Sequence, residues 1–455
     1  MGQSDPVVAR VSDAAAIGRR GLAVGALALF LLGILLVGLH VAAYSRVSPI
    51  DETQHIDYLY KSPHIVARDE RIAQDAMREV ACRGLDSGFV PPACAPGAVY
   101  DPNAFPELGY NTAAINSPVY YTLTHWLAVP VQWLTGMDSL VTAARLIGGV
   151  WLGLGMAVTF LAGRRLGVPA GPLAAAAALP AAAPTVLYLS STITPDAMTL
   201  LVGAAVVSTT LDWQDRPARR WPALAAVAAL AVLVKQTNLL ILAAVGVYLL
   251  LRWIGAVRAR SREVGDEPRP SSWLIGLAAV AGGAGAAVVF WTIVYSRHPT
   301  PADLPMAVNS LVDVLHIDDV LAATGQLLEI PQAWGLGPGS LGLSILITRL
   351  VRIALLVGVI GAAVFASGSM ARTTLPGLAR GAAVAGLIGA PALIVLNYLV
   401  AHSFFVIPDR YGYSLLAVMA IALAGIARRR TAGVTVVCAS AVVVGLTVLR
   451  LLLAL

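Results

Sequence analysis

The stretch SPIDETQHID, which begins at Ser48, brings Asp51, Glu52 and His55 together directly after a long apolar run. A carboxylate in this setting can accept a proton from a reacting hydroxyl, so the stretch is a candidate for general base chemistry. A second interpretation stays open. A serine, a proline and then an acid three residues after the serine are typical of a helix start, so Asp51 could serve only as part of a helix cap.

A second set of residues is basic and borders apolar segments. Lys235 interrupts LAVLVKQTNLLIL, Arg410 lies in FFVIPDRYGY, and Arg145 precedes LIGGVWLGL. A charge within the membrane costs several kcal/mol unless it meets a partner or water, although Lys235 could extend to the interface and Arg410 could pair with Asp409. Several such cations at helix ends would suit a phosphate group held at the membrane boundary.

One further acid, Asp196 in SSTITPDAMTL, is expected at a turn on the same side as Lys235 and Arg410. Taken alone, it could simply cap the helix that follows Thr194 and the next proline. A carboxylate base beside cations that hold a lipid phosphate would make a site for glycosyl transfer.

The amino-acid composition indicates what kind of structural elements position these residues. The 455 residues are 58% hydrophobic and 12% charged, with a mean hydropathy of +0.77. Ordinary globular chains carry about 25% charged residues, so the sequence predicts an all-α polytopic membrane protein forming a single transmembrane domain over 1–455. The net charge of +6 is explained below by basic loops, and a nucleic-acid partner is not expected.

Apolar runs long enough to cross about 30 Å of hydrocarbon predict about eleven transmembrane helices. They lie near 20–44, 144–163, 170–189, 197–212, 221–234, 237–254, 273–295, 349–367, 381–405, 411–427 and 433–454. If the N-terminus is cytoplasmic, the loops on that side carry 18 of the 31 Lys and Arg residues, as the positive-inside rule requires. The sequence therefore predicts a multi-pass plasma membrane protein with a cytoplasmic N-terminus.

This orientation places two long loops outside the cell. The first, 45–118, contains the acidic stretch and is expected to be catalytic, and the second covers 296–345. The segment 116–134 is aromatic and amphipathic, and counting it as a span would reverse every basic loop after it. We therefore expect a helix that lies at the outer interface.

Cysteine placement agrees with an external loop. Cys82 and Cys94 both lie in 45–118, and the third cysteine is in the last predicted span. A pair of cysteines in an oxidising compartment is expected to form a disulfide.

The motifs in order, SPIDETQH, NSPVYYTLTHW, AARLIGGVWLGL, TPDAMTL, LVKQTNLL and IPDRYGYSLL, resemble the GT-C superfamily of polyprenyl-phosphate-sugar-dependent glycosyltransferases. The bacterial protein mannosyltransferases and lipid A aminoarabinose transferases belong to this group. The resemblance implies a GT-C-like fold, and an inverting transfer of a sugar from a polyprenyl phosphate to a glycan, lipid or protein acceptor of the cell envelope. Two features differ from the family: Asn116-Ser117-Pro118 stands where the family has His-Pro-Pro, and no soluble domain follows the last span.

The resemblance also implies roles for individual residues. Asp51 would be the catalytic base, with Glu52 beside it in acceptor or metal binding, and the donor phosphate would be held by three cations. These cations are Lys235, Arg410 and Arg145. The expected substrate-binding residues are His55, Tyr120, Tyr121, Asp196 and Tyr411.

No cofactor is firmly expected. A divalent cation, Mg²⁺ or Mn²⁺, is left open, with Asp51, Glu52 and His55 as its candidate ligands. A transporter or flippase of lipid-linked sugars, or a non-catalytic subunit of an envelope assembly, remains the alternative function. The Ala, Val, Gly and Arg bias suggests a GC-rich bacterial genome, whereas the sugar, the acceptor and the oligomeric state are not indicated by the sequence.

Overall fold

The computed structural model describes residues 6–86, 89–260, 270–305, 310–329, 341–364 and 374–455. Over these residues the chain is helical and has no strand longer than an isolated bridge. The α-helices are α1 (Pro6–Ala43), α2 (Glu52–Lys61), α3 (Gln74–Arg83), α4 (Val119–Thr135), α5 (Leu140–Arg165), α6 (Ala170–Ala182), α7 (Pro184–Ser190), α8 (Thr199–Asp215), α9 (Pro217–Val234), α10 (Leu239–Arg260), α11 (Pro270–Tyr295), α13 (Ile317–Ala322), α14 (Leu341–Val364), α15 (Thr374–Ala401), α16 (Leu416–Ile426) and α17 (Arg430–Leu452).

Eight helices of the described residues are long and apolar enough to cross a membrane. A ninth span is possible if α6 and α7, which are bent by 73° at Ala183, count as one. The prediction of a helical membrane protein is confirmed at this level. Two of the eleven predicted spans do not meet the same criteria, because α8 has 17 residues and α16 has 11.

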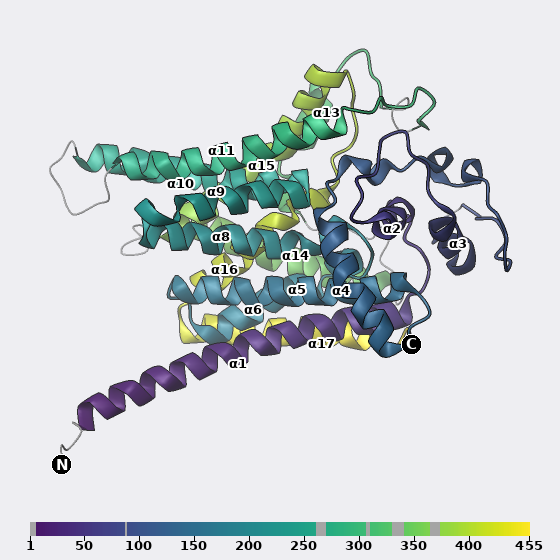
Figure 1. Cartoon of the computed structure of the whole chain (residues 1–455). Coiled ribbons are helices and arrows are strands. Elements are labelled where there is room, and N and C mark those ends of the chain that lie inside the picture. Colours follow the sequence, from purple (N-terminus) through teal and green to yellow (C-terminus); the bar gives the residue numbers. More distant parts are fainter. Residues whose placement is uncertain (1–5, 87–88, 261–269, 306–309, 330–340, 365–373) are drawn as a thin grey trace.

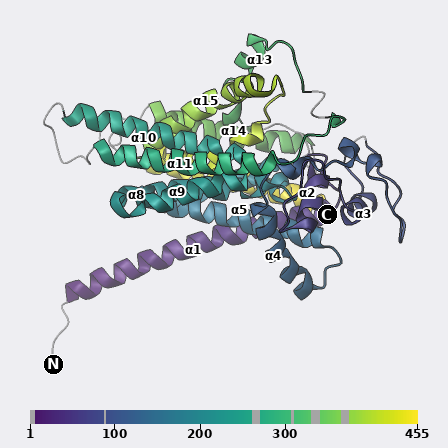
Figure 2. The same cartoon turned by 45° about the horizontal axis from the view of Figure 1, so that its top comes forward.

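The long helices run side by side and give the bundle two distinct ends (Figure 1). The N-terminal end of α1 and the turn between α8 and α9 lie at one end, and α2, α3 and α13 lie at the other (Figures 1 and 2). We call these the arginine end and the loop end. Of the basic loop residues predicted to share one side, Arg262, Arg269 and Arg372 lie outside the described residues.

Hydrogen bonds join the two predicted external loops at the loop end. Arg68 donates to the hydroxyl of Thr300 over 2.9 Å, and Tyr110 donates to a carboxylate oxygen of Asp303 over 2.9 Å. The indole of Trp291 in α11 also donates to a backbone carbonyl of the first loop. The loops therefore lie on one side of the bundle, as predicted, although residues 306–309 and 330–340 of the second loop are outside the described part.

Helix α4 projects away from the bundle at the loop end (Figure 2). Its residues Trp126, Trp133 and Leu134 are 61%, 81% and 73% exposed. The opposite face is buried, with Tyr120 and Tyr121 at 1% and 0%. A helix of 17 residues with an exposed apolar face fits the predicted interfacial helix better than a buried span.

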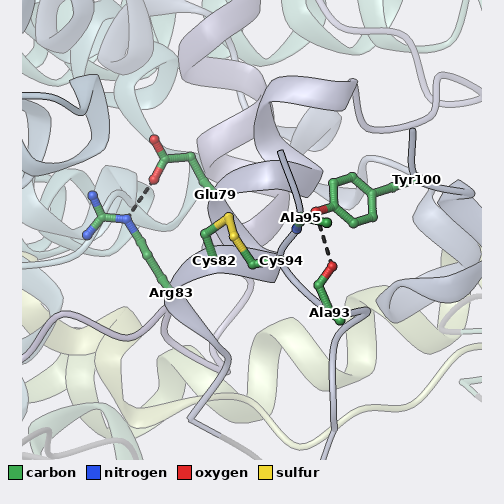
Figure 3. Close-up of a disulfide and its surroundings, with 7 residues drawn as sticks. All are labelled: Glu79, Cys82, Arg83, Ala93, Cys94, Ala95 and Tyr100. Carbon is green, nitrogen blue, oxygen red and sulfur yellow. Dashed lines mark hydrogen bonds and ion pairs between the residues drawn. A yellow bond between two sulfur atoms is a disulfide. The ribbon is translucent and has the colours of Figure 1, made fainter. Parts of the chain in front are cut away.

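The structure contains the Cys82–Cys94 disulfide, which ties the end of α3 to the following loop (Figure 3). One turn earlier in α3, Glu79 accepts hydrogen bonds from Arg83 and from Ser139 at the start of α5. The disulfide thus joins an otherwise irregular segment to a helix that is itself anchored on the bundle.

Candidate active site

Four charged residues from distant parts of the sequence meet at the loop end of the bundle. Lys235 Nζ lies 2.5 Å from one carboxylate oxygen of Asp196, and Arg410 Nε lies 3.4 Å from the other. An Nη of Arg410 also lies 3.6 Å from a carboxylate oxygen of Asp51. We call Asp51, Asp196, Lys235 and Arg410 the polar cluster.

Breaks in helices position these side chains. Lys235 follows the last residue of α9, where the backbone becomes extended before the short 3₁₀ helix Gln236–Asn238. Asp196 lies in the 3₁₀ helix η4 (Pro195–Met198), which Thr194 caps by accepting from the Asp196 backbone N–H. Arg410 lies in the 3₁₀ helix η8 (Asp409–Leu415), so each of the three is next to a helix end.

Two glycines allow these breaks to approach the bundle. A Cβ at Gly203 of α8 would overlap the carbonyl oxygen of Ser414 in η8, and a Cβ at Gly148 of α5 would overlap the carbonyl oxygen of Ser190 in α7. Backbone that comes this close to a helix requires glycine. The positions of Arg410 and Asp196 therefore depend on α8 and α5.

Asp51 has a left-handed backbone conformation, with φ of 57° and ψ of 7°. Helix α2 begins at Glu52, Asp51 is its N-cap, and the Asp51 side chain makes no capping hydrogen bond. The predicted cap, with Ser48 at the N-cap and Asp51 three residues later, is wrong because residues 49–51 form a turn and the helix begins only at Glu52. Within this turn Ser48 accepts from the backbone N–H of Ile50. Capping does not explain Asp51, whose side chain is 52% exposed.

Glu52 and Arg145 form a separate, fully buried ion pair, with both side chains 1% exposed. Arg145 donates from Nε and from one Nη to the two carboxylate oxygens, over 2.9 and 2.7 Å. Its remaining bonds go to three successive backbone carbonyls, those of Tyr44, Ser45 and Arg46. We call Glu52 and Arg145 the buried pair.

The carboxylate of Glu52 also accepts from two backbone N–H groups. One belongs to Ser48, at 2.7 Å, and the other to Ile193, at 2.9 Å. The buried pair therefore joins α2, the end of α1, the start of α5 and the turn before Asp196.

These contacts do not fit two predicted roles. Arg145 has its donors directed to protein acceptors, so it is not placed to hold a donor phosphate. Both oxygens of Glu52 are engaged, so it is not placed to bind an acceptor or a metal ion. The described residues contain no group of three or more His, Cys, Asp or Glu arranged to hold a metal, and Asp51, Glu52 and His55 do not form one.

His55, Tyr120 and Tyr121 lie beside the polar cluster rather than within it. His55 Nδ1 is 2.6 Å from the hydroxyl of Tyr121, and the hydroxyl of Tyr120 accepts from the backbone N–H of Thr194. Burial, with the positive charges of Lys235 and Arg410, lowers the pKa of His55 to about 3, so the imidazole is neutral. Tyr411 contributes its ring, whose centre is 5.1 Å from Lys235 Nζ.

Within the polar cluster, the carboxylate of Asp196 is fully paired with cations, whereas the guanidinium of Arg410 is not fully hydrogen-bonded. Burial acts to raise the pKa of Asp196, but Lys235 and Arg410 outweigh it and hold that pKa below its usual value. Arg410 Nε, in contrast, is buried without a hydrogen-bond partner, because its contact with Asp196 at 3.4 Å is only an ion pair. Asp409 accepts from Gln326 instead, so the alternative pairing of Arg410 with Asp409 is absent.

Sequence reasoning missed two polar contacts. The hydroxyl of Thr194 lies 3.3 Å from a carboxylate oxygen of Asp196. The order Thr-Pro-Asp could have indicated Thr194 as the helix cap. The acid Asp57 is fully buried and pairs with Lys61, four residues later in α2, a spacing that could have indicated the pair. It also accepts from Asn111, which no local pattern indicates. Asp57 therefore ties α2 to later parts of the first loop.

No protein-family model matches the chain, and neither a curated protein nor a solved structure matches it.

Proposed function

We propose that this protein is a membrane glycosyltransferase that moves a sugar from a polyprenyl-phosphate donor to a cell-envelope acceptor on the extracytoplasmic face, with inversion at the anomeric carbon. One observation carries the proposal. The half-exposed carboxylate of Asp51 stands 3.6 Å from Arg410, whose Nε has no hydrogen-bond acceptor, at the end of a bundle of membrane-length helices. A proton acceptor and an unsatisfied cation thus lie in one place.

In this proposal, Asp51 accepts the proton of the acceptor hydroxyl as that oxygen forms a bond to the anomeric carbon. The bond from the anomeric carbon to the phosphate oxygen breaks, and its electron pair stays on the polyprenyl phosphate that leaves. Arg410 and Lys235 stabilise the additional negative charge on this phosphate. Asp196 holds the two cations in place, and it is less suited to act as the base because both of its oxygens face cations.

The proposal includes eleven spans, as expected for a GT-C-like fold, and helix lengths support this number. The 17 residues of α8 extend about 26 Å, and η8 together with α16 extends about 30 Å at 3₁₀ and α-helical rises. Both lengths are close to the hydrocarbon thickness. These two segments would add to the eight long helices and the bent pair α6–α7 to make eleven.

The deciding experiment incubates the purified protein with synthetic polyprenyl-phospho-sugars and reads transfer or hydrolysis by mass spectrometry. Asp51→Asn should remain folded and donor-bound but lower the rate by about 10²-fold or more, because the proton acceptor is lost. Ser48→Ala is the matched control, since it removes a local hydrogen bond of the same turn and should leave turnover nearly unchanged. Full activity of Asp51→Asn would refute the assignment of the base.

The proposed orientation has its own test. Val99 is 85% exposed in the first loop, so Val99→Cys in a Cys438→Ser background should react with an impermeant thiol reagent in intact cells. Arg429→Cys at the arginine end should be protected under the same conditions. The reverse pattern would place the polar cluster in the cytoplasm and exclude an extracytoplasmic reaction.

A further inference from the structure

A cavity of about 340 Å³ lies at the arginine end, between the start of α6 and the start of α17. These two helices run side by side along the lower edge of the bundle (Figure 1). The cavity is lined by the consecutive residues Arg428, Arg429 and Arg430 and, beneath them, by Pro172, Val434 and Val437. Its volume is at the lower end of the range of about 300–1,000 Å³ typical of small-molecule sites.

Local backbone geometry brings the three arginines around one opening. Helix α16 ends at Ile426 and α17 begins at Arg430, so the chain reverses direction within this short turn. Gly433 allows α17 to pack closely on α6, because a Cβ there would lie 3.1 Å from Pro172 Cγ. Pro172, Val434 and Val437 form the apolar floor of this open cavity, with Val434 itself 54% exposed, beside the three exposed arginines.

These arginines differ from others at the same end of the bundle. Arg165 pairs with Asp212 and Asp215 at 2.7 and 2.9 Å, and Arg380 donates to the carbonyl of Ala363. In the described part of the chain, Arg428, Arg429 and Arg430 make no side-chain hydrogen bond or ion pair. A positive-inside loop requires the charges but does not require them to surround a cavity with an apolar floor.

The depth of the cavity follows from α17. This helix has 23 residues, which extend about 35 Å and therefore cross the hydrocarbon with one end at each boundary. Arg430 opens the helix, so the cavity lies at the level of lipid head groups. Val434 and Val437 follow Arg430 along α17, on the hydrocarbon side of the arginines.

We propose that this cavity binds the phosphate of an anionic membrane lipid, with the first acyl carbons on the floor made by Pro172, Val434 and Val437. Guanidinium groups bind phosphate oxygens through paired hydrogen bonds, and basic pockets between transmembrane helices take anionic head groups. A free phosphate would use the same arginines but would leave the apolar floor uncovered. The site is separate from the polar cluster, which lies at the other end of α5 and α8.

The test uses native mass spectrometry of the purified full chain, delipidated in detergent and then exposed to equal amounts of phosphatidylglycerol and phosphatidylcholine. The wild type should retain one phosphatidylglycerol in preference to phosphatidylcholine. The variant Arg428→Gln/Arg429→Gln/Arg430→Gln should lose at least about 10-fold of this retention, because the charge-assisted hydrogen bonds to the phosphate are lost. Adding lipid after purification avoids any effect of the variant on membrane insertion.

The matched control is Arg219→Gln/Arg220→Gln, which removes two exposed arginines from the first turn of α9 at the same end but outside this cavity. It should retain phosphatidylglycerol like the wild type. If the triple variant does not purify as a monodisperse protein, Arg429→Gln alone gives the same comparison with a smaller loss. Equal loss in the control, or equal retention of both lipids by the wild type, would overturn the proposal. Competition by soluble glycerol 1-phosphate at the lipid's own concentration would assign the site to free phosphate and overturn the lipid assignment.

Discussion

The buried pair and the polar cluster contain the same chemical groups in opposite conditions. Arg145 makes hydrogen bonds with Glu52 and three backbone carbonyls and is 1% exposed. Arg410 makes two ion pairs longer than 3 Å, and its side chain is 20% exposed. A guanidinium that is already satisfied can only hold structure, whereas one with an unsatisfied donor can accept a ligand. Asp51 and Glu52 are adjacent in the sequence, yet they belong to different sets. Glu52 holds the structure in the buried pair, whereas Asp51 lies beside the guanidinium group that can accept a ligand.

The largest effect is expected from breaking the buried pair. Glu52→Gln should lower the free energy of unfolding by about 3–5 kcal/mol, because it leaves the charge of Arg145 buried without compensation. Chemical unfolding in mixed micelles measures this change. The double variant Glu52→Gln/Arg145→Gln should recover part of the loss, and a stable single variant would show that the pair is not needed for folding.

Removal of the Cys82–Cys94 disulfide should have the next largest effect on the free energy of unfolding. It should leave the buried pair and the polar cluster unchanged. Cys82→Ser/Cys94→Ser is expected to lower the unfolding free energy of the first loop by about 3 kcal/mol, following the chain-entropy model. Faster proteolysis in residues 84–94 measures this loosening. Cys438→Ser is the control, because Cys438 is an exposed free cysteine of α17. Free thiols at both positions in the intact mass of the unreduced wild type would contradict the disulfide.

A smaller effect should follow from changing the unsatisfied guanidinium. Arg410→Gln is expected to weaken binding of polyprenyl phosphate at least about 10-fold, since a hydrogen bond to a charged group contributes about 1.5–3 kcal/mol. Isothermal titration in detergent provides the measurement. Arg352→Gln is a matched control, because Arg352 is already paired with Glu329 at 2.9 Å. If Arg410→Gln binds polyprenyl phosphate as tightly as the wild type, Arg410 does not differ from Arg145 in holding a ligand.

The smallest effect is the pH dependence that comes from His55. Its pKa is lowered from 6.5 to about 3, so the unfolded chain takes up a proton below about pH 6.5 while the folded protein does not. This contribution to stability is complete above pH 6.5 and decreases as the pH falls towards 3. The melting temperature should therefore fall between pH 6.5 and 4.5, and less so in His55→Asn. His64→Asn, at an exposed histidine of the same loop, should behave like the wild type.

Sequence patterns predicted the helices well where apolar length determined them, as in α5, α10 and α17. They also located α8 and α16, within the predicted spans 197–212 and 411–427, but they did not predict that each helix begins after a 3₁₀ segment, which hydropathy cannot distinguish from the rest of a span. The sequence singled out Asp51, Asp196, Lys235 and Arg410 because polar residues are rare at the ends of apolar runs, and the structure brings these four side chains together.

The partner of each charge could not be read from the sequence. Arg145 and Arg410 both border apolar runs, and only the fold decides that Glu52, 93 residues earlier, saturates the former. The same limit applies to the turn at Ser48, where a common capping pattern predicted the helix start three residues too early, with the N-cap at Ser48 instead of Asp51. The acid that accepts from the Ser48 backbone N–H is Glu52.

The close approaches at Gly148 and Gly203 have a consequence for how this protein tolerates substitution. Neither residue has a functional group, yet any side chain at either position would push aside the backbone of Ser190 or Ser414, in the segments that carry Asp196 and Arg410. A saturation mutagenesis screen for loss of activity should therefore identify these two glycines together with the charged residues. Positions without any reactive atom would then be among the least replaceable in the chain.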